Sequence, residues 1–238
     1  LILFLCIVGA IGINPISAQK REAKATKKHS KPHCWDAGLL AGVAYYNGEM
    51  HCPDLGLSNL RPGGGVYTRY AFNDKLFGRL NFQFGQIQGK DNVFNEDWRK
   101  LRNFSFSSVF YDGALLLEWE PFGALRYGRS GKTFRRILSP YIHSGIAGVY
   151  SKPDVNFNEP NLVTQQSDID IDKSNKKFFH PAIPIGGGLK YDLNKSWTIG
   201  AEAAVRIALT DYLDGVSMAG NPNKRDWYET FNLNLGYR

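Results

Sequence analysis

The sequence predicts an all-β fold, an eight-stranded antiparallel up-and-down transmembrane β-barrel that follows a short disordered N-terminal arm. Eight segments place apolar side chains at every second position, and a strand sends successive side chains to opposite faces. The connections between these segments alternate between short and long, which is typical of membrane-spanning barrels. After residue 18, the chain of 238 residues contains no apolar run long enough for a transmembrane helix.

Residues 1–18 are uncharged and largely apolar, and they end in the small residues Ser17 and Ala18. We interpret this segment as a secretory signal peptide and expect the mature chain to begin at Gln19. A transmembrane anchor is the alternative, but the run is short and is interrupted by glycine and proline. Residues 19–34 are polar, basic and without periodicity, so we expect a disordered arm there and a single barrel domain over residues 35–238.

Each predicted strand has one apolar and one polar face. The eight segments are Trp35–Tyr46, Gly64–Phe72, Leu76–Gln88, Phe106–Trp119, Pro140–Tyr150, Pro181–Tyr191, Ser196–Asp211 and Asp226–Tyr237. The seventh could also form a helix, in which Glu202 and Arg206 would pair four residues apart. Its seven companions of the same period favour a strand, and a soluble β-sandwich is the main alternative fold.

The lengths of the connections predict which end of the barrel faces the periplasm. Connections after the second and sixth strands are three or four residues long, whereas those after the first, third, fifth and seventh are long. Outer-membrane barrels place their short turns in the periplasm and their long loops outside. The long link at residues 121–137, after the fourth strand, is the exception to the alternation. By parity, this link and the N-terminal arm both face the periplasm.

The positive charge is concentrated in these two periplasmic segments. Residues 19–35 hold six basic residues and one acidic residue, and residues 121–137 hold five basic residues and no acidic one. The formal charge of the whole chain is +7, so the remainder is acidic overall. Such segments suit an acidic protein surface or anionic lipid headgroups, and nucleic acid is not an expected partner in this compartment.

The polar faces of the strands converge on the barrel interior. We predict a polar network there made of Arg69, Arg79, Asp112, Glu118, Lys190, Glu202 and Arg206, accompanied by Asn81, Gln83 and His143. An eight-stranded barrel is just wide enough for side chains to fill it, and buried charges need partners. The nearly balanced charges therefore favour a packed interior over a conducting pore.

No catalytic, cofactor or metal site is predicted. His143 and Ser144 cannot act together with Asp112 as a triad, because consecutive strand residues point to opposite faces. The acidic run Asp168–Asp172 resembles the start of a calcium loop, but Lys173 occupies the position that requires glycine. We therefore expect a solvated acidic loop.

The two cysteines of the mature chain lie at opposite ends of the first strand. This separation argues against zinc held by the His33-Cys34 and His51-Cys52 pairs, and against a bond between Cys34 and Cys52. In an oxidising compartment an unpaired cysteine suggests a disulfide to another protein, and Cys34 is the better candidate. The alternative is an idle thiol.

Three short strings resemble a known family: Arg102–Phe106, Thr210–Ser217 and Asp226–Tyr228. They are similar to strings of the PorG-type family of small outer-membrane β-barrels from Bacteroidetes-type bacteria, which includes a component of the type IX secretion system. The resemblance covers about residues 35–238. It implies a non-enzymatic barrel without cofactors, associated with a periplasmic ring of a PorK-like lipoprotein and a PorN-like protein.

With this resemblance, we expect docking of the ring through Lys27, Lys28, Arg129, Arg135 and Arg136, and a covalent link through Cys34. Outer-membrane lipids are the other expected partner. A lipid-modifying or small-solute outer-membrane barrel is the alternative function.

Overall fold

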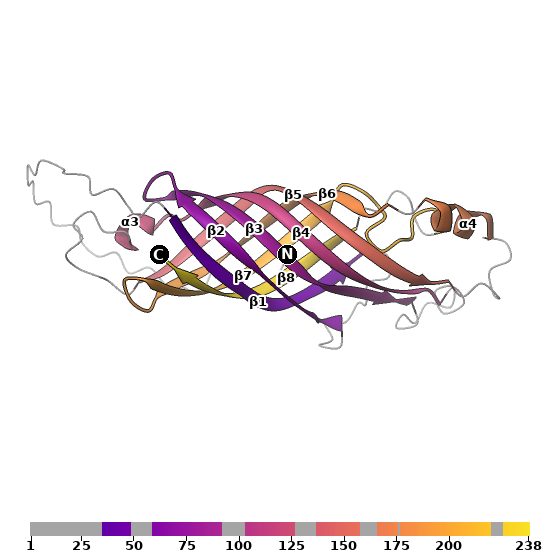
Figure 1. Cartoon of the computed structure of the whole chain (residues 1–238), viewed down its shortest axis with the longest axis horizontal. Coiled ribbons are helices and arrows are strands. Elements are labelled where there is room, and N and C mark those ends of the chain that lie inside the picture. The colour runs from indigo at the N-terminus through magenta and orange to yellow at the C-terminus, as the bar shows by residue number, and fades with distance from the viewer. Residues whose placement is uncertain are drawn as a thin grey trace, which may run out of the picture.

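The computed structural model describes residues 35–48, 59–91, 103–126, 137–157, 166–175, 177–219 and 226–238. These residues form a closed antiparallel barrel in which neighbouring strands follow the chain order and β1 pairs with β8 (Figure 1). The predicted fold class is therefore confirmed, and the sandwich alternative is wrong.

The strands match the predicted segments to within a few residues at nearly every end. They are β1 (Trp35–Asn47), β2 (Arg61–Ala71), β3 (Leu76–Lys90), β4 (Ser105–Trp119), β5 (Leu138–Asn156), β6 (Phe179–Asp192), β7 (Trp197–Ala208) and β8 (Trp227–Tyr237). The largest difference is β5, which continues beyond Tyr150 to Asn156. Beyond Tyr150 the outward residues of β5 are polar. The alternation of apolar and polar residues therefore ends at Tyr150, although the strand continues.

The two faces of the barrel wall have opposite character. Outward side chains are mostly apolar and exposed, with Ile146 at 67% and Leu233 at 69%. Inward side chains are buried and include many charged groups. An apolar exterior around a polar interior is the arrangement of outer-membrane-type β-barrels, and it inverts that of a soluble protein.

The connections divide the barrel into two distinguishable ends. We call the end with the short turns at residues 72–75 and 193–196 the inner end, and the opposite end the outer end. Both short turns have the same construction, because the Oδ1 atoms of Asn73 and Asn194 each accept backbone N–H bonds from residues two and three positions later. The helix α3 (Gly123–Arg126) lies at the inner end and α4 (Gln166–Ser174) at the outer end (Figure 1). Among the described residues, no helix combines the length and apolar character needed to cross a membrane.

Glycines inside the barrel make room for large side chains from opposing strands. A Cβ atom on Gly38 would lie 2.6 Å from the Tyr67 ring, and one on Gly236 would lie 2.5 Å from the Tyr67 hydroxyl. Tyr67 therefore fills space that the two glycines leave open, in a barrel whose interior is only wide enough for side chains.

Candidate functional site

The centre of the inner network is Glu118 on β4. One of its carboxylate oxygens accepts a hydrogen bond from Arg69 Nη1 on β2 at 2.6 Å and another from Lys190 Nζ on β6. Its other oxygen lies 3.7 Å from Arg79 Nη1 on β3. One buried carboxylate thus connects strands from different sides of the barrel.

A second carboxylate, Glu202 on β7, extends this arrangement. Arg79 Nη1 donates to Glu202 Oε2 at 2.5 Å, and the Tyr141 hydroxyl donates to the same oxygen at 2.7 Å. Lys190 Nζ lies 3.9 Å from the centre of the Tyr141 ring, a distance that allows a cation–π interaction. The two carboxylates are therefore joined through shared basic and aromatic partners.

The third predicted acidic residue, Asp112, pairs with Arg206. Arg206 Nε donates to Asp112 Oδ2, and its two terminal nitrogens donate to Thr230 at 2.7 Å and to Gln83 at 2.8 Å. The Tyr228 hydroxyl also donates to Asp112, at 3.1 Å. The structure thus places all seven predicted network residues inside the barrel and pairs each with an opposite charge.

Further charged residues close the inner end, and the alternation of the strands did not predict them. Arg126 of α3 is buried and donates two hydrogen bonds to Asp192, at 2.7 and 3.0 Å, and one to Glu120 at 2.6 Å. Arg238 also donates to Asp192, and Asp36 accepts from Arg69. Arg126 is one of the five basic residues of the link at residues 121–137, and its charge is buried and paired inside the barrel.

The charges of the inner network balance. In the described part of the chain, this charge network contains six basic residues (Arg69, Arg79, Arg126, Lys190, Arg206 and Arg238) and six acidic ones (Asp36, Asp112, Glu118, Glu120, Asp192 and Glu202). A buried charge without a partner is costly, so each member of the charge network depends on the others.

The outer part of the interior is apolar instead. We call this cluster the outer plug; its members are Ala44, Tyr46, Ile87, Phe104, Phe106, Phe110, Val149, Ile169, Ala182, Leu213, Val216, Ala219 and Tyr228. Inward residues of the strands meet residues of the long loops here. The three strings that carry the family resemblance all contribute, through Phe104 and Phe106, through Leu213 and Val216, and through Tyr228. These strings therefore build the packing at the outer end.

Helix α4 is fastened to the β7–β8 loop by Asp172. The Asp172 carboxylate accepts backbone N–H bonds from Ser217 at 3.1 Å, Met218 at 3.0 Å and Ala219 at 2.9 Å. The expectation of a solvated acidic loop is therefore wrong for Asp172 and for Ile169, which are both buried. The acidic run gave no signal of this role, because its partners lie more than 40 residues away.

Two acidic residues share one hydroxyl group in the same region. Tyr46 Oη lies 2.7 Å from Asp214 Oδ2 and 2.5 Å from Asp226 Oδ1. A hydroxyl has one hydrogen, so a proton on one carboxyl group satisfies the second contact. Burial, reinforced by the negative charge of Asp226, raises the pKa of Asp214 well above its ordinary value.

A serine–histidine pair lies at the outer end, and it does not involve His143 or Ser144. Ser151 Oγ is 2.9 Å from His180 Nε2, and His180 Nδ1 is 2.6 Å from Thr210 Oγ1. Ser151 and His180 are completely buried, so the pair ties β5, β6 and the β7–β8 loop together. His143 points inward, whereas Ser144 donates to the Pro184 carbonyl, so these neighbours do not meet.

The six predicted docking residues Lys27, Lys28, Cys34, Arg129, Arg135 and Arg136 lie outside the described residues. Within the described ranges, no group of three histidine, cysteine or acidic side chains is arranged to hold a metal ion.

The comparison with protein families identifies one. The sequence model of the family described as "Domain of unknown function (DUF6089)" matches residues 25–237. The chain belongs to the DUF6089 family. No curated protein matches this DUF6089 chain in sequence.

Several solved structures resemble the DUF6089 barrel. The outer membrane protein OprG from Pseudomonas aeruginosa is 14% identical, with 86% of this chain and 95% of that chain covered and a TM-score of 0.44. A major outer membrane protein from Thermus thermophilus is 12% identical, with 86% and 99% covered and a TM-score of 0.42. Ail, the attachment invasion locus protein of Yersinia pestis, is 12% identical, with 86% and 95% covered and a TM-score of 0.40.

Proposed function

We propose that this protein is a sealed outer-membrane barrel that docks a periplasmic ring of the type IX secretion system at the outer membrane. The filled interior is the observation that carries the proposal. Balanced charges occupy its inner part and the outer plug occupies the rest. Because paired charges and apolar side chains occupy the interior, we assign the function to the two ends of the barrel and not to its interior.

The exterior supports the location in the outer membrane. On β5 the outward positions from Leu138 to Tyr150 are apolar or small, and Lys152 is the first charged one. At about 3.3 Å per residue and a tilt of about 45°, this stretch spans roughly 28 Å, close to the roughly 25 Å of an outer-membrane barrel's apolar band.

The resemblance to the PorG-type family supports the secretion role, with one refinement. The three strings that carry the resemblance pack inside the outer plug, so they indicate that the chains share this packing. Docking must therefore involve other residues. The basic residues Lys27, Lys28, Arg129, Arg135 and Arg136 and the thiol of Cys34 are the docking groups that we propose for the periplasmic side.

The proposal is tested by extracting the full chain from cells in mild detergent and identifying the proteins that accompany it. We expect a PorK-like lipoprotein and a PorN-like protein in the extract. Replacing Arg129, Arg135 and Arg136 by glutamine should reduce their recovery, whereas replacing Lys75 and Lys195 in the short turns should not. Extraction of the chain alone, with the ring intact elsewhere in the same cells, would contradict the docking role.

Cys34→Ser tests the covalent link separately. The link predicts that a slow band on a non-reducing gel disappears in Cys34→Ser and persists in the matched variant Cys52→Ser. A lipid-modifying barrel would be indicated instead by altered lipid A in a deletion strain with normal secretion. Such a result would overturn the docking proposal.

A further inference from the structure

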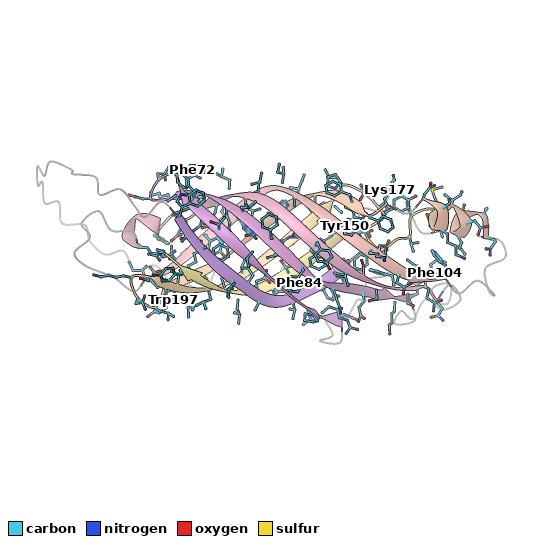
Figure 2. The ribbon with its side chains drawn as sticks, in the orientation of Figure 1. Phe72, Phe84, Phe104, Tyr150, Lys177 and Trp197 are labelled. Carbon is cyan, nitrogen blue, oxygen red and sulfur yellow. The ribbon has the colours of Figure 1, made fainter. Side chains whose placement is uncertain are left out.

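An aromatic row crosses the outside of the barrel on four consecutive strands. Phe84, Tyr111, Tyr150 and Phe179 are successive cross-strand partners on β3, β4, β5 and β6. Their side chains are between 47% and 62% exposed, and Figure 2 places Phe84 and Tyr150 on the barrel wall. Aromatic side chains gather at the level of the lipid headgroups in membrane barrels.

Polar residues follow this row toward the outer end. Gln86 follows Phe84 on β3 and Lys152 follows Tyr150 on β5, whereas on β4 the exposed Val109 separates Tyr111 from Ser107. Lys152 is exposed and pairs across the sheet with Val109, so its ammonium group stands directly beyond the apolar surface. On β5 the apolar outward surface therefore ends at Tyr150, and Lys152 is the first charged outward residue.

A second lysine lies beside Lys152. Tyr150 pairs with Phe179, and the next backbone contact is an N–H bond from Ser151 to the Phe178 carbonyl at 2.8 Å. Continuing this antiparallel pairing by one residue brings Lys177 next to Lys152. Lys177 is exposed, and its Nζ lies 5.1 Å from the centre of the Tyr212 ring (Figure 2).

Neither ammonium group forms an ion pair within the described ranges, although Lys177 lines the same cavity as Asp154. Among the described residues, no carboxylate forms an ion pair with either lysine; the nearest outward acidic residue along β5 is Asp154. Tyr150 and Phe178 precede and follow the two lysines closely in the chain, and the centroids of their rings are 6.1 Å apart. Two lysine ammonium groups therefore lie next to exposed aromatic side chains. This combination suits a ligand with an anionic group and an apolar group.

We propose that Lys152 and Lys177 bind the phosphate of an anionic lipid in the outer leaflet, whose acyl chains lie along Tyr150, Phe179 and Ile146. A lysine ammonium is a compact point charge suited to phosphate, and each lysine near a charged membrane surface contributes about 1 kcal/mol, or about fivefold in affinity. The inference rests on the proposed outer-membrane location and is independent of the secretion role.

The test uses the full chain purified in a neutral detergent and native mass spectrometry to count bound lipid. The probes are lipid A with its phosphates, the same lipid after removal of the phosphates, and inorganic phosphate as a competitor. We expect K152Q/K177Q to bind phosphorylated lipid A about 25-fold more weakly than the unaltered chain. The matched control K75Q/K195Q, with both substitutions in the exposed short turns, should bind normally.

Three outcomes would overturn the inference. They are equal binding of phosphorylated and dephosphorylated lipid, unchanged binding by K152Q/K177Q, and full displacement of the lipid by inorganic phosphate at equal concentration. Heat-dependent gel migration verifies that both variants retain the folded barrel. Recovery of the periplasmic ring, measured on the same variants, should not change, so loss of lipid binding and loss of docking are distinguishable.

Discussion

The charge network and the outer plug fill the same barrel by opposite chemistry. The charge network is built mostly by inward strand residues such as Glu118 and Glu202, whose positions follow from the strand register. The outer plug also needs loop residues such as Leu213 and Ile169, which reach the interior only when the loops fold inward. The inner half therefore depends on pairing within the wall, whereas the outer half depends on the docking of loops onto the wall.

The largest expected effect comes from removing one charge of the charge network. Glu118→Gln keeps the shape of the side chain but leaves Arg69 and Lys190 without their shared carboxylate. We expect a loss of about 3–5 kcal/mol in the free energy of unfolding, measured by urea titration in lipid vesicles. Glu229→Gln, an outward position on β8, should change little. Equal effects of the two substitutions would show that the charge network does not stabilise the inner half.

The outer plug should respond to the loss of apolar volume. Leu213 is completely buried, so Leu213→Ala opens a cavity and is expected to cost about 3 kcal/mol. The loss should appear as faster proteolysis of the outer loops while the barrel still migrates as folded on gels. Leu209→Ala, at an exposed position in the same connection, provides the control. Loss of the barrel itself would contradict the separation of the two halves.

A smaller effect is expected where α4 meets the loop. In Asp172→Asn, an NH₂ group replaces one carboxylate oxygen. This group cannot accept a hydrogen bond, so the backbone N–H groups that face it lose their acceptor. We expect a local loss of about 2 kcal/mol, seen as faster hydrogen exchange at the amides of Ser217 and Ala219. Asp170→Asn, on the exposed side of α4, should leave this exchange unchanged.

The smallest effect concerns pH. The pKa of Asp214 is raised above 3.8, so its protonated form favours the folded loop. This contribution is fully present below pH 3.8 and is lost as the pH rises through the folded-state pKa. Hydrogen exchange at Leu213 and Val216 should therefore become faster toward neutral pH, beyond the intrinsic rate. Asparagine does not titrate, so this pH dependence of the exchange should be absent in Asp214→Asn. If the variant showed the same pH dependence as the unaltered chain, the proton shared by Asp214 and Asp226 would be contradicted.

The sequence predicts the wall and the middle of the interior, because both follow from alternation along strands. Glu202 and Arg206 are assigned to the interior as soon as β7 is recognised as a strand. Arg126 and Asp192 could not be assigned in this way, since one lies in a four-residue helix and the other at the end of a strand. The outer plug was also beyond prediction, because apolar residues in a loop carry no period that indicates where they pack.

The pairing of Tyr67 with Gly38 and Gly236 has a consequence for how the barrel assembles. Alternation distinguishes a correct register from a slip of one residue, but a slip of two residues keeps every side chain on its own face. Such a slip between β1 and β2 would set Tyr67 against Leu40 or Asp36, which carry side chains where Gly38 has none. The fit of the Tyr67 ring against Gly38 and Gly236 therefore favours one strand register. Other registers would keep the same apolar and polar faces but would lose this fit.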